Sequence, residues 1–271
     1  MHMTNNYASC IVVKYGGAAM PVSQAGEPDP ILKEIVALRA AGSAVVLVHG
    51  GGPEIDCALA RSGIETERID GMRVTDAATL DVTESVLCGS VNKRIVREAL
   101  TLGIPAVGIS GEDGGMLVAE RLTTPRGEGL GFVGRIVATD ARLLHLLLGA
   151  GLVPVVAPLA IAGDKSHAYN VNADLAAAAI AAALRADVFV AVTNVARVFR
   201  DPNDPASGID NLTPDEAFRF AESEACRSSM KPKLEAAARA VRNGATVAYI
   251  CSAKPNAIAA AIRGEATKIC A

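Results

Sequence analysis

The sequence is poor in aromatic residues and contains no tryptophan. Phe and Tyr make up 3% of its 271 residues, so it lacks the rings on which single-stranded nucleic acids stack and the aromatic belts of membrane proteins. Its 26 basic and 29 acidic side chains give a net charge of −3. That balance excludes a protein that gains affinity by releasing counterions from a polyanion. We therefore expect no nucleic-acid partner.

The sequence also lacks a targeting segment and an unbroken membrane span. No apolar run follows a basic start at the N-terminus, so no signal peptide is readable. The stretch from Leu146 to Gly163 carries no charge and is long enough to span a bilayer. Pro154, Pro158 and two glycines break it into a helix end, a turn and a short strand. We expect no membrane partner and a cytoplasmic location.

The six cysteines lack a metal-binding or disulfide pattern. They are scattered along the chain, with no C-x-x-C pair and no histidine at ligand spacing. Small apolar side chains in a reducing compartment are the simpler interpretation. The sequence therefore predicts no metal held by protein ligands.

Apolar runs bounded by turns alternate with amphipathic stretches, which is typical of an α/β protein with a mainly parallel sheet. The clearest predicted helix runs from about Ala77 to Leu102, where apolar residues recur at helical spacing before Gly103. The predicted strands are Cys10–Lys14, Ala44–Val48, Ala106–Ile109, Val153–Ala157, Val188–Val192 and Thr246–Ile250. The other predicted helices are Asp29–Ala41, Pro53–Ser62, Asp140–Leu148, Ala173–Arg185, Thr213–Glu224 and Lys231–Gly244.

Two glycine-rich segments follow predicted strands. Lys14-Tyr-Gly-Gly17 places a cation beside backbone N–H groups that an anionic oxygen can approach. His49-Gly-Gly-Gly52-Pro53 lies between a strand and a helix, where exposed N–H groups form an anion site. Each segment can also be an ordinary turn without a bound anion, and Lys14 would then be exposed to solvent. Neither is a Walker A loop, so a P-loop kinase is excluded at the level of motifs.

Two later clusters combine polar groups at helix starts. In Tyr169-Asn-Val-Asn172-Ala-Asp174, Asn172 or Asp174 can cap a helix, but two amides and a carboxylate also suit an amide-bearing ligand. In Met230-Lys-Pro-Lys233, two lysines at a helix N-terminus require a compensating anion unless they are solvated. Gly129-Leu-Gly131-Phe-Val-Gly134 matches G-x-G-x-x-G but follows no strand, so we expect a β-hairpin that lines a pocket.

Seven segments together resemble the amino acid kinase family in order and spacing, from about residue 10 to the C-terminus. They are Lys14-Tyr-Gly-Gly, Val48-His-Gly-Gly-Gly-Pro53, Gly71-Met-Arg-Val-Thr-Asp76, Gly89-Ser-Val-Asn-Lys93, Leu130-Gly-Phe-Val-Gly134, Asn170-Val-Asn-Ala-Asp174 and Met230-Lys-Pro-Lys233. The resemblance implies a three-layer α/β/α sandwich with a mainly parallel central sheet. It also implies an N-terminal lobe, residues 1–165, for acyl amino acid binding and dimerisation, and a C-terminal lobe, residues 166–271, for ATP. A polar turn cluster at residues 163–167 marks the boundary.

The resemblance implies ATP-dependent phosphorylation of the side-chain carboxylate of N-acetyl-L-glutamate, a step of arginine biosynthesis. By motif, Lys14 and Lys233 flank the transferring phosphoryl group and Asp174 holds both lysines. Substrate binding falls to Gly17, Gly50, Gly51, Arg73, Asn170 and Asn172, and nucleotide binding to Thr193, Asn194 and Met230. The implied cofactors are ATP and Mg²⁺, with the Mg²⁺ carried by ATP. The implied assembly is a homodimer through the helix near Ala77–Leu102.

The nucleotide lobe departs from the family's pattern. Arg227-Ser228-Ser229 stands where the family usually has a glycine pair, Asn194 where relatives have Asp, and Arg197 where they have Gly. The tail from Glu265 to Ile269 lacks the usual Gly before Thr267. We expect these changes to affect which nucleotide binds, and how tightly, more than the type of reaction.

Two alternatives stay open. Some relatives phosphorylate an aminoadipate side chain carried on a small acidic protein, and others are expected to use other N-blocked acidic amino acids. A carrier requires a basic surface, to which Arg121, Arg126 and Arg135 contribute unless they form a solvated hairpin face. The intact glycine motifs favour free acetylglutamate. A catalytically weak binding or regulatory protein on the same fold is the second alternative, and the presence of Lys14, Asp174 and Lys233 opposes it.

Overall fold

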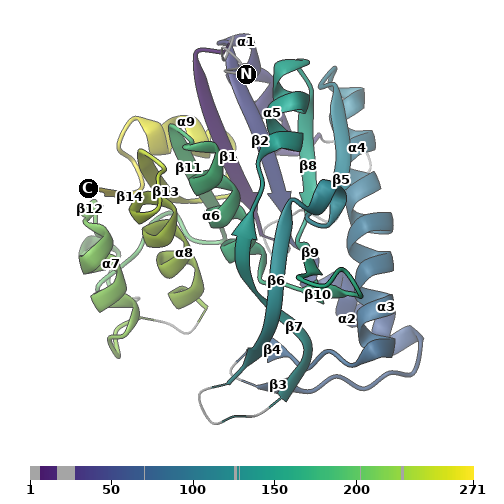
Figure 1. The fold of residues 1–271 in the computed structure, drawn as a ribbon. Coiled ribbons are helices and arrows are strands. Elements are labelled where there is room, and N and C mark those ends of the chain that lie inside the picture. The colour runs from purple at the N-terminus through teal and green to yellow at the C-terminus, as the bar shows by residue number, and fades with distance from the viewer. Residues whose placement is uncertain are drawn as a thin grey trace.

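A mixed sheet of eight strands crosses the molecule (Figure 1). The computed structural model describes residues 7–16, 28–69, 71–124, 127, 129–201, 203–226 and 229–271. Within these ranges the sheet strands are β1 (Ser9–Tyr15), β2 (Ser43–His49), β5 (Ala106–Ser110), β8 (Val153–Ala157), β11 (Val188–Thr193), β12 (Asn211–Leu212), β13 (Val247–Ser252) and β14 (Thr267–Cys270). Their order is β12-β14-β13-β11-β1-β2-β8-β5, and all neighbours are parallel except β13 and β14.

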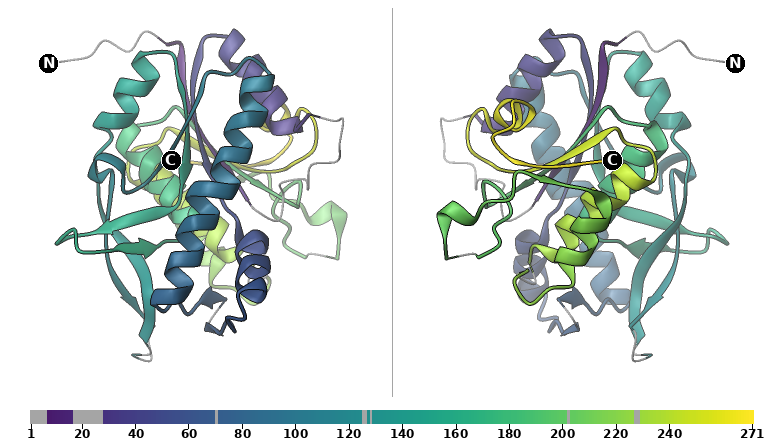
Figure 2. Two further views of the ribbon diagram at one scale, coloured as in Figure 1. Left: turned by 90° about the vertical axis from the view of Figure 1, so that its right-hand side faces the viewer. Right: turned by 90° about the vertical axis from the view of Figure 1, so that its left-hand side faces the viewer.

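Helices cover both faces of this sheet, which gives the three layers seen edge-on in Figure 2. The helices are α1 (Pro30–Ala40), α2 (Gly52–Arg61), α3 (Ala77–Glu84), α4 (Asn92–Thr101), α5 (Arg142–Gly149), α6 (Ala173–Leu184), α7 (Pro214–Ala221), α8 (Lys231–Arg242) and α9 (Ala257–Ile262). Short 3₁₀ turns are η3 (Asp113–Gly115) and η4 (Pro205–Ser207). α5, α6 and α8 pack on one face of the sheet, and α1, α4 and α9 pack on the other. The predicted fold class is confirmed.

Alternation along the central strand separates two apolar cores. In β1, Cys10 and Val12 join the core under α6, whereas Ile11 and Val13 join the core under α1. Because side chains alternate between the faces of a strand, Lys14 follows Cys10 and Val12 toward the α6 side. The strand sequence therefore decides which layer of helices its lysine meets.

The predicted helix near Ala77–Leu102 is continuous, but it contains a π-helical segment. α3, η2 (Ser85–Val91) and α4 follow one another without a break. The Asp76 side chain caps the start by accepting a hydrogen bond from the Thr79 N–H at 2.7 Å. Leu87 and Val91 of η2 are buried against the glycine turn after β2. The π-helical segment η2 is therefore the part of this helix that packs on the glycine turn.

A small closed barrel lies beside the main sheet. It consists of β6 (Leu117–Thr123), β7 (Gly129–Thr139), β9 (Leu159–Ala162) and β10 (Ala168–Asn170). β6 and β7 form the hairpin expected from the glycines after residue 128. Gly131 has a φ of +68°, and a Cβ there would lie 2.1 Å from the Thr75 carbonyl oxygen. The glycine is thus required by close packing of two backbones.

The division into lobes at residue 165 stays a prediction. Residues 163–167 form the turn between β9 and β10, which pair with each other inside the barrel.

β3 (Arg68–Ile69) and β4 (Met72–Arg73) form a second short hairpin. Among the helices of the described ranges, none combines the length and apolar character that a bilayer crossing requires.

Candidate active site

Lys14, the glycine turn and Thr193 lie at the carboxyl edge of the parallel strands. Tyr15, the last residue of β1, lies opposite His49 of β2 and Val192 of β11. The glycine turn after β2 and Thr193 of β11 therefore meet near the end of β1. Ligands of open α/β sheets bind at this edge.

Lys14 and Lys233 meet at one carboxylate, that of Asp174. The Lys14 Nζ lies 2.8 Å from Asp174 Oδ1, and the Lys233 Nζ lies 3.7 Å from Asp174 Oδ2. Lys14 and Asp174 are each 5% exposed. The three side chains come from β1, α6 and α8, so only the fold brings them together.

This cluster has an excess of positive charge. Two ammonium groups share one carboxylate, and the Lys233 amine also donates to the Ser229 carbonyl at 3.1 Å. Burial lowers the pKa of Lys233, Asp174 opposes the shift, and Lys14 adds to it. An anion placed between the lysines would supply the missing charge.

The glycine turn offers a second anion-binding element. α2 begins at Gly52 with Pro53 in its first turn, so the turn lies at the positive end of a helix. A Cβ on Gly51 would lie 2.7 Å from Leu87 Cδ2, so a larger residue there would displace the Leu87 side chain of η2. The Gly50 N–H already donates to the Tyr15 carbonyl at 3.0 Å. Of the two predicted donors, Gly50 is thus engaged in the fold.

His49 and Asn92 hold the glycine turn in place through hydrogen bonds. His49 is fully buried, and burial lowers the pKa of its ring to about 4, so the imidazole is neutral. Its Nδ1–H donates to the Gly50 carbonyl at 2.8 Å, and its Nε2 accepts from the Asn92 amide at 3.2 Å. Asn92 Nδ2 also donates to the Val155 carbonyl at 2.8 Å. A neutral histidine thus links the turn to α4 and β8.

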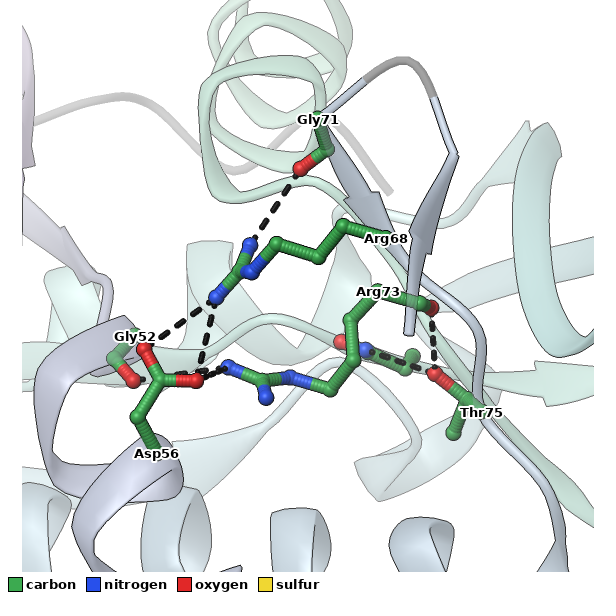
Figure 3. Close-up of polar contacts among 7 residues, drawn as sticks. Gly52, Asp56, Arg68, Gly71, Arg73 and Thr75 are labelled. Atoms are coloured by element: carbon green, nitrogen blue, oxygen red, sulfur yellow. Dashed lines mark hydrogen bonds and ion pairs between the residues drawn. The ribbon is translucent and has the colours of Figure 1, made fainter. Parts of the chain in front are cut away.

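Arg73 and Asn170, both predicted to bind substrate, are joined through Thr75. The Thr75 hydroxyl donates to the Arg73 carbonyl at 2.9 Å and accepts from Asn170 Nδ2 at 3.4 Å. The Arg73 guanidinium reaches back toward the glycine turn, with Nη2 3.5 Å from the Gly52 carbonyl (Figure 3). Arg73 is 6% exposed. These residues therefore border the same region as the glycine turn.

Asn172 acts as a helix cap. Its Oδ1 accepts hydrogen bonds from the N–H groups of Asp174 and Leu175, at 2.8 and 3.2 Å. Asp174 is therefore free to pair with the lysines. Of the two residues that the sequence offered as helix caps, Asn172 is the cap, and Asp174 pairs with the lysines as the resemblance implied.

The predicted nucleotide residues lie in two places. The Thr193 hydroxyl, at the end of β11, donates to Asn194 Oδ1 at 3.1 Å. Met230 directly precedes α8 and packs partly buried against the core. No hydrogen bond or ion pair within the described ranges joins Met230 to Thr193 or Asn194. Gly17, Arg227 and Ser228 lie outside the described residues.

Arg197, expected from the sequence to depart from the family pattern, has a structural role. Arg197 Nη1 lies 2.7 Å from Asp210 Oδ1. The Arg197 side chain also packs on Gly208, where an added Cβ would lie 2.5 Å from Arg197 Cδ. Thr267 binds the same region, because its hydroxyl donates to the Ile209 carbonyl and accepts from the Val198 N–H. Arg197 therefore anchors the segment after β11.

Two residues near the site, Asp56 and Arg68, were not singled out from the sequence, and Asn92 was included in the Gly89-Ser-Val-Asn-Lys93 segment without a role. Asn92 lies on the buried side of a helix, and a polar residue among apolar ones there signals a buried partner. Asp56 and Arg68 both contact the Arg73 region. They look like ordinary exposed positions in the sequence, and no signal identifies them.

Comparison with protein families gives a match over most of the chain. The model described as "Amino acid kinase family" matches residues 9–252. An acetylglutamate kinase of Rubrobacter xylanophilus is 43% identical over 254 residues, which is 94% of this chain and 93% of that protein. An acetylglutamate kinase of Methanopyrus kandleri is 48% identical over 208 residues, or 76% of this chain and 84% of that protein.

A solved structure shares the fold. The N-acetylglutamate synthase from Neisseria gonorrhoeae, complexed with coenzyme A and N-acetyl-glutamate, superposes with a TM-score of 0.81 at 23% identity. The match covers 98% of this chain and 60% of the synthase chain.

Proposed function

From the premise that the chain belongs to the amino acid kinase family, we propose how its residues carry out the acetylglutamate kinase reaction. The chain is a phosphotransferase with a carboxyl group as acceptor, acting in arginine biosynthesis. ATP donates its γ-phosphoryl group to the side-chain carboxylate of N-acetyl-L-glutamate, which yields an acyl phosphate and ADP. The observation that carries the proposal is the convergence of two lysines on Asp174, from a strand whose end lies beside the glycine turn before α2.

The chemistry requires charge stabilisation and no general base. A side-chain carboxylate with an ordinary pKa near about 4.3 is already ionised at neutral pH. The obstacle is repulsion between this carboxylate and the phosphates of ATP. Phosphoryl transfer proceeds in line and depends on positioning and electrostatic stabilisation. The excess charge of the lysine cluster meets that need.

Each predicted site residue receives one role in the proposal. Lys14 and Lys233 contact the phosphoryl group in transfer, and Asp174 holds both amines in place. Gly51 offers its N–H to the phosphoryl group, whereas Gly50 would first exchange its bond to Tyr15. The remaining assignments are Gly17 to the phosphoryl group, Arg73 to the α-carboxylate, Asn170 and Asn172 to the N-acyl group, and Thr193, Asn194 and Met230 to the nucleotide.

We propose that Mg²⁺ enters with ATP, bound to its phosphates. The buried carboxylate at the site, Asp174, is already paired with two lysines and does not fit the role of a metal ligand. Within the described ranges, no group of three or more His, Cys, Asp or Glu side chains is arranged to hold a metal ion. The residues therefore suit a metal–nucleotide substrate.

A carrier-bound substrate finds less support on the hairpin surface. Arg135 forms an ion pair with Glu120, which neutralises one of the arginines that a carrier would need. Arg121 is exposed, and Arg126 lies outside the described residues. We therefore propose free N-acetyl-L-glutamate as the substrate.

The direct test is to trap the acyl phosphate. The protein is incubated with ATP, Mg²⁺, hydroxylamine and one N-acyl amino acid at a time: N-acetylglutamate, N-acetylaspartate or N-acetylaminoadipate. We expect a hydroxamate, at the highest rate with N-acetylglutamate, and a rate lowered roughly 10²-fold or more in a Lys233→Met variant. A faster reaction with aminoadipate would favour the other substrate class. ATP binding without any adduct would favour a binding protein.

We further propose a cytoplasmic homodimer. The helix from Ala77 to Thr101 leaves one side exposed, including Gly89, Lys93 and Leu100. Leu100 is 53% exposed. A second copy of the helix would cover this side, and the reaction draws on ATP, which the cytoplasm supplies.

A further inference from the structure

Asp56 of α2 reaches across to the arginine proposed to bind the substrate. Its Oδ1 lies 2.7 Å from Arg73 Nη2. The same carboxylate receives the Arg68 Nη2 at 3.2 Å from both of its oxygens. Figure 3 shows Arg68 and Arg73 extending toward Asp56 from the β3–β4 hairpin. One carboxylate thus lies between two guanidinium groups.

The second amino group of Arg73 lacks a partner. Its Nη1 is buried and makes no hydrogen bond within the described residues. A buried charged donor without a partner is costly. Because two guanidinium groups share one carboxylate, the cluster also carries one net positive charge. Both features indicate an anion on the Nη1 side of Arg73.

We propose that Asp56 is a positioning residue for substrate binding. It holds Arg73 by Nη2, so that Nη1 points to the α-carboxylate of the acyl amino acid. Arg68 also pairs with Asp56, so this carboxylate does not fully neutralise Arg73. The remaining positive charge can attract the anionic substrate. This inference rests on the proposed function, because it assigns the α-carboxylate to Arg73.

The exposure of the three side chains favours positioning over stability. The Asp56 and Arg68 side chains are 48% and 44% exposed, whereas that of Arg73 is 5% exposed. Ion pairs at exposed positions contribute little to folding. Holding a buried, rotamer-rich side chain in its binding geometry instead lowers the entropic cost of association. The benefit of Asp56 should thus appear in substrate affinity.

The test compares Asp56→Ala with the wild type on two substrates. One is N-acetylglutamate, and the other is 4-acetamidobutanoate, which keeps the acylamino group and the reacting carboxylate but has no α-carboxylate. We expect Asp56→Ala to raise the KM for N-acetylglutamate about tenfold or more, the range of a lost hydrogen bond to a charged group. The kcat, the KM for ATP and the kcat/KM for 4-acetamidobutanoate should change less than about twofold.

Two further variants serve as controls. Asp56→Asn keeps an oxygen acceptor for Arg73 without the charge and should recover part of the lost affinity. Glu65→Ala removes an exposed carboxylate from the segment between α2 and β3 and should leave all constants unchanged.

Three results would overturn the inference. Equal losses on both substrates would mean a general structural role for Asp56. An unchanged KM for N-acetylglutamate would mean that Arg73 needs no support. A lower KM would mean that Asp56 competes with the substrate. Failure of the proposed function is distinct, because the wild type itself would then phosphorylate no N-acetylglutamate.

Discussion

Asp174 stabilises two cations that would otherwise repel each other in a largely buried place. Lys14 comes from the first strand of the sheet and Lys233 from a helix more than two hundred residues later. Asp174 lies within ion-pair distance of both amines. In the proposed reaction both amines are in place before the phosphoryl group enters, so little reorganisation is needed.

Removing either amine should therefore slow the chemical step. We expect Lys14→Met or Lys233→Met to lower kcat by roughly 10²-fold or more, since loss of one preorganised donor costs roughly 3 kcal/mol of transition-state stabilisation. Lys231→Met is the matched control, because Lys231 lies on the same helix turn but pairs with Glu222. Initial rates at saturating substrates give the comparison. Near-wild-type turnover in the Lys14 or Lys233 variant would refute the assignment.

The buried histidine should make stability depend on pH. The pKa of His49 is about 4 in the folded protein and about 6.5 when unfolded. The unfolded chain therefore binds more protons between these values, and the free energy of unfolding falls as the pH falls through this window. From about pH 7 to about pH 5 we expect a loss of about 2 kcal/mol from this residue.

Urea unfolding across this pH range tests the histidine effect. A His49→Gln variant should be less stable near neutral pH but should lose about 2 kcal/mol less on acidification. The same slope in both proteins would show that other groups cause the pH dependence.

At the level of residues, the motifs predicted the polar groups but not their partners. The glycine and lysine segments identified Lys14, Asp174 and Lys233, which the structure brings together. Asp56 could not be found in this way, because its contact with Arg73 depends on how the β3–β4 hairpin folds against α2. The engagement of Gly50 with Tyr15 likewise follows from strand register and not from composition.

At the scale of elements, the start of α6 caps the helix and, in the proposed function, also binds the substrate. Asn172→Ala should lower the free energy of unfolding by about 1 kcal/mol, because it removes the acceptor for two helix N–H groups. Asn172→Asp should keep that stability, since a carboxylate also caps and suits the helix dipole. It lacks the amide N–H, however, and should raise the KM for N-acetylglutamate about fivefold.

Thermal or urea unfolding and steady-state kinetics separate these effects. Thr213→Ala removes the capping box of α7 and is the control, with a stability loss of about 1 kcal/mol and no change in KM. An unchanged KM in Asn172→Asp would restrict Asn172 to its capping role.

Most of the longer elements were predicted and the shortest ones were not. β6 and β7 are long exceptions, because the glycines after residue 128 indicated only a hairpin there. Apolar runs predicted β1, β2, β5, β8, β11 and β13, because a buried parallel strand is apolar on both faces. β3, β4 and β12 have two residues each, too few for any periodicity. The π-helical η2 was also missed, since its apolar spacing resembles that of an α-helix. Leu87 and Val91 of this segment pack on the glycine turn after β2.

At the scale of the whole molecule, the proposed dimer is open to a direct mass measurement. Light scattering at micromolar concentration should give about twice the 27.8 kDa of one chain. Gly89 is exposed on the helix, and a Cβ there would meet nothing within 4 Å. Gly89→Arg should therefore leave the protomer folded but keep a second helix away, giving a monomer. Gly89→Ala is the control and should stay dimeric.

A monomeric wild type would contradict the dimer proposal outright. If the Gly89→Arg variant is still a dimer, the interface lies on another surface of the protein.

The central place of β1 shapes how the chain can fold on the ribosome. β1 emerges first and can pair with β2 soon afterwards, but its other neighbour, β11, starts only at Val188. Until then one edge of an apolar strand has no hydrogen-bonding partner, and open edges of this kind invite association with other nascent chains. Slow translation before β11, or premature termination there, should thus lead to aggregation, whereas a chain interrupted after β13 would already have β1 enclosed.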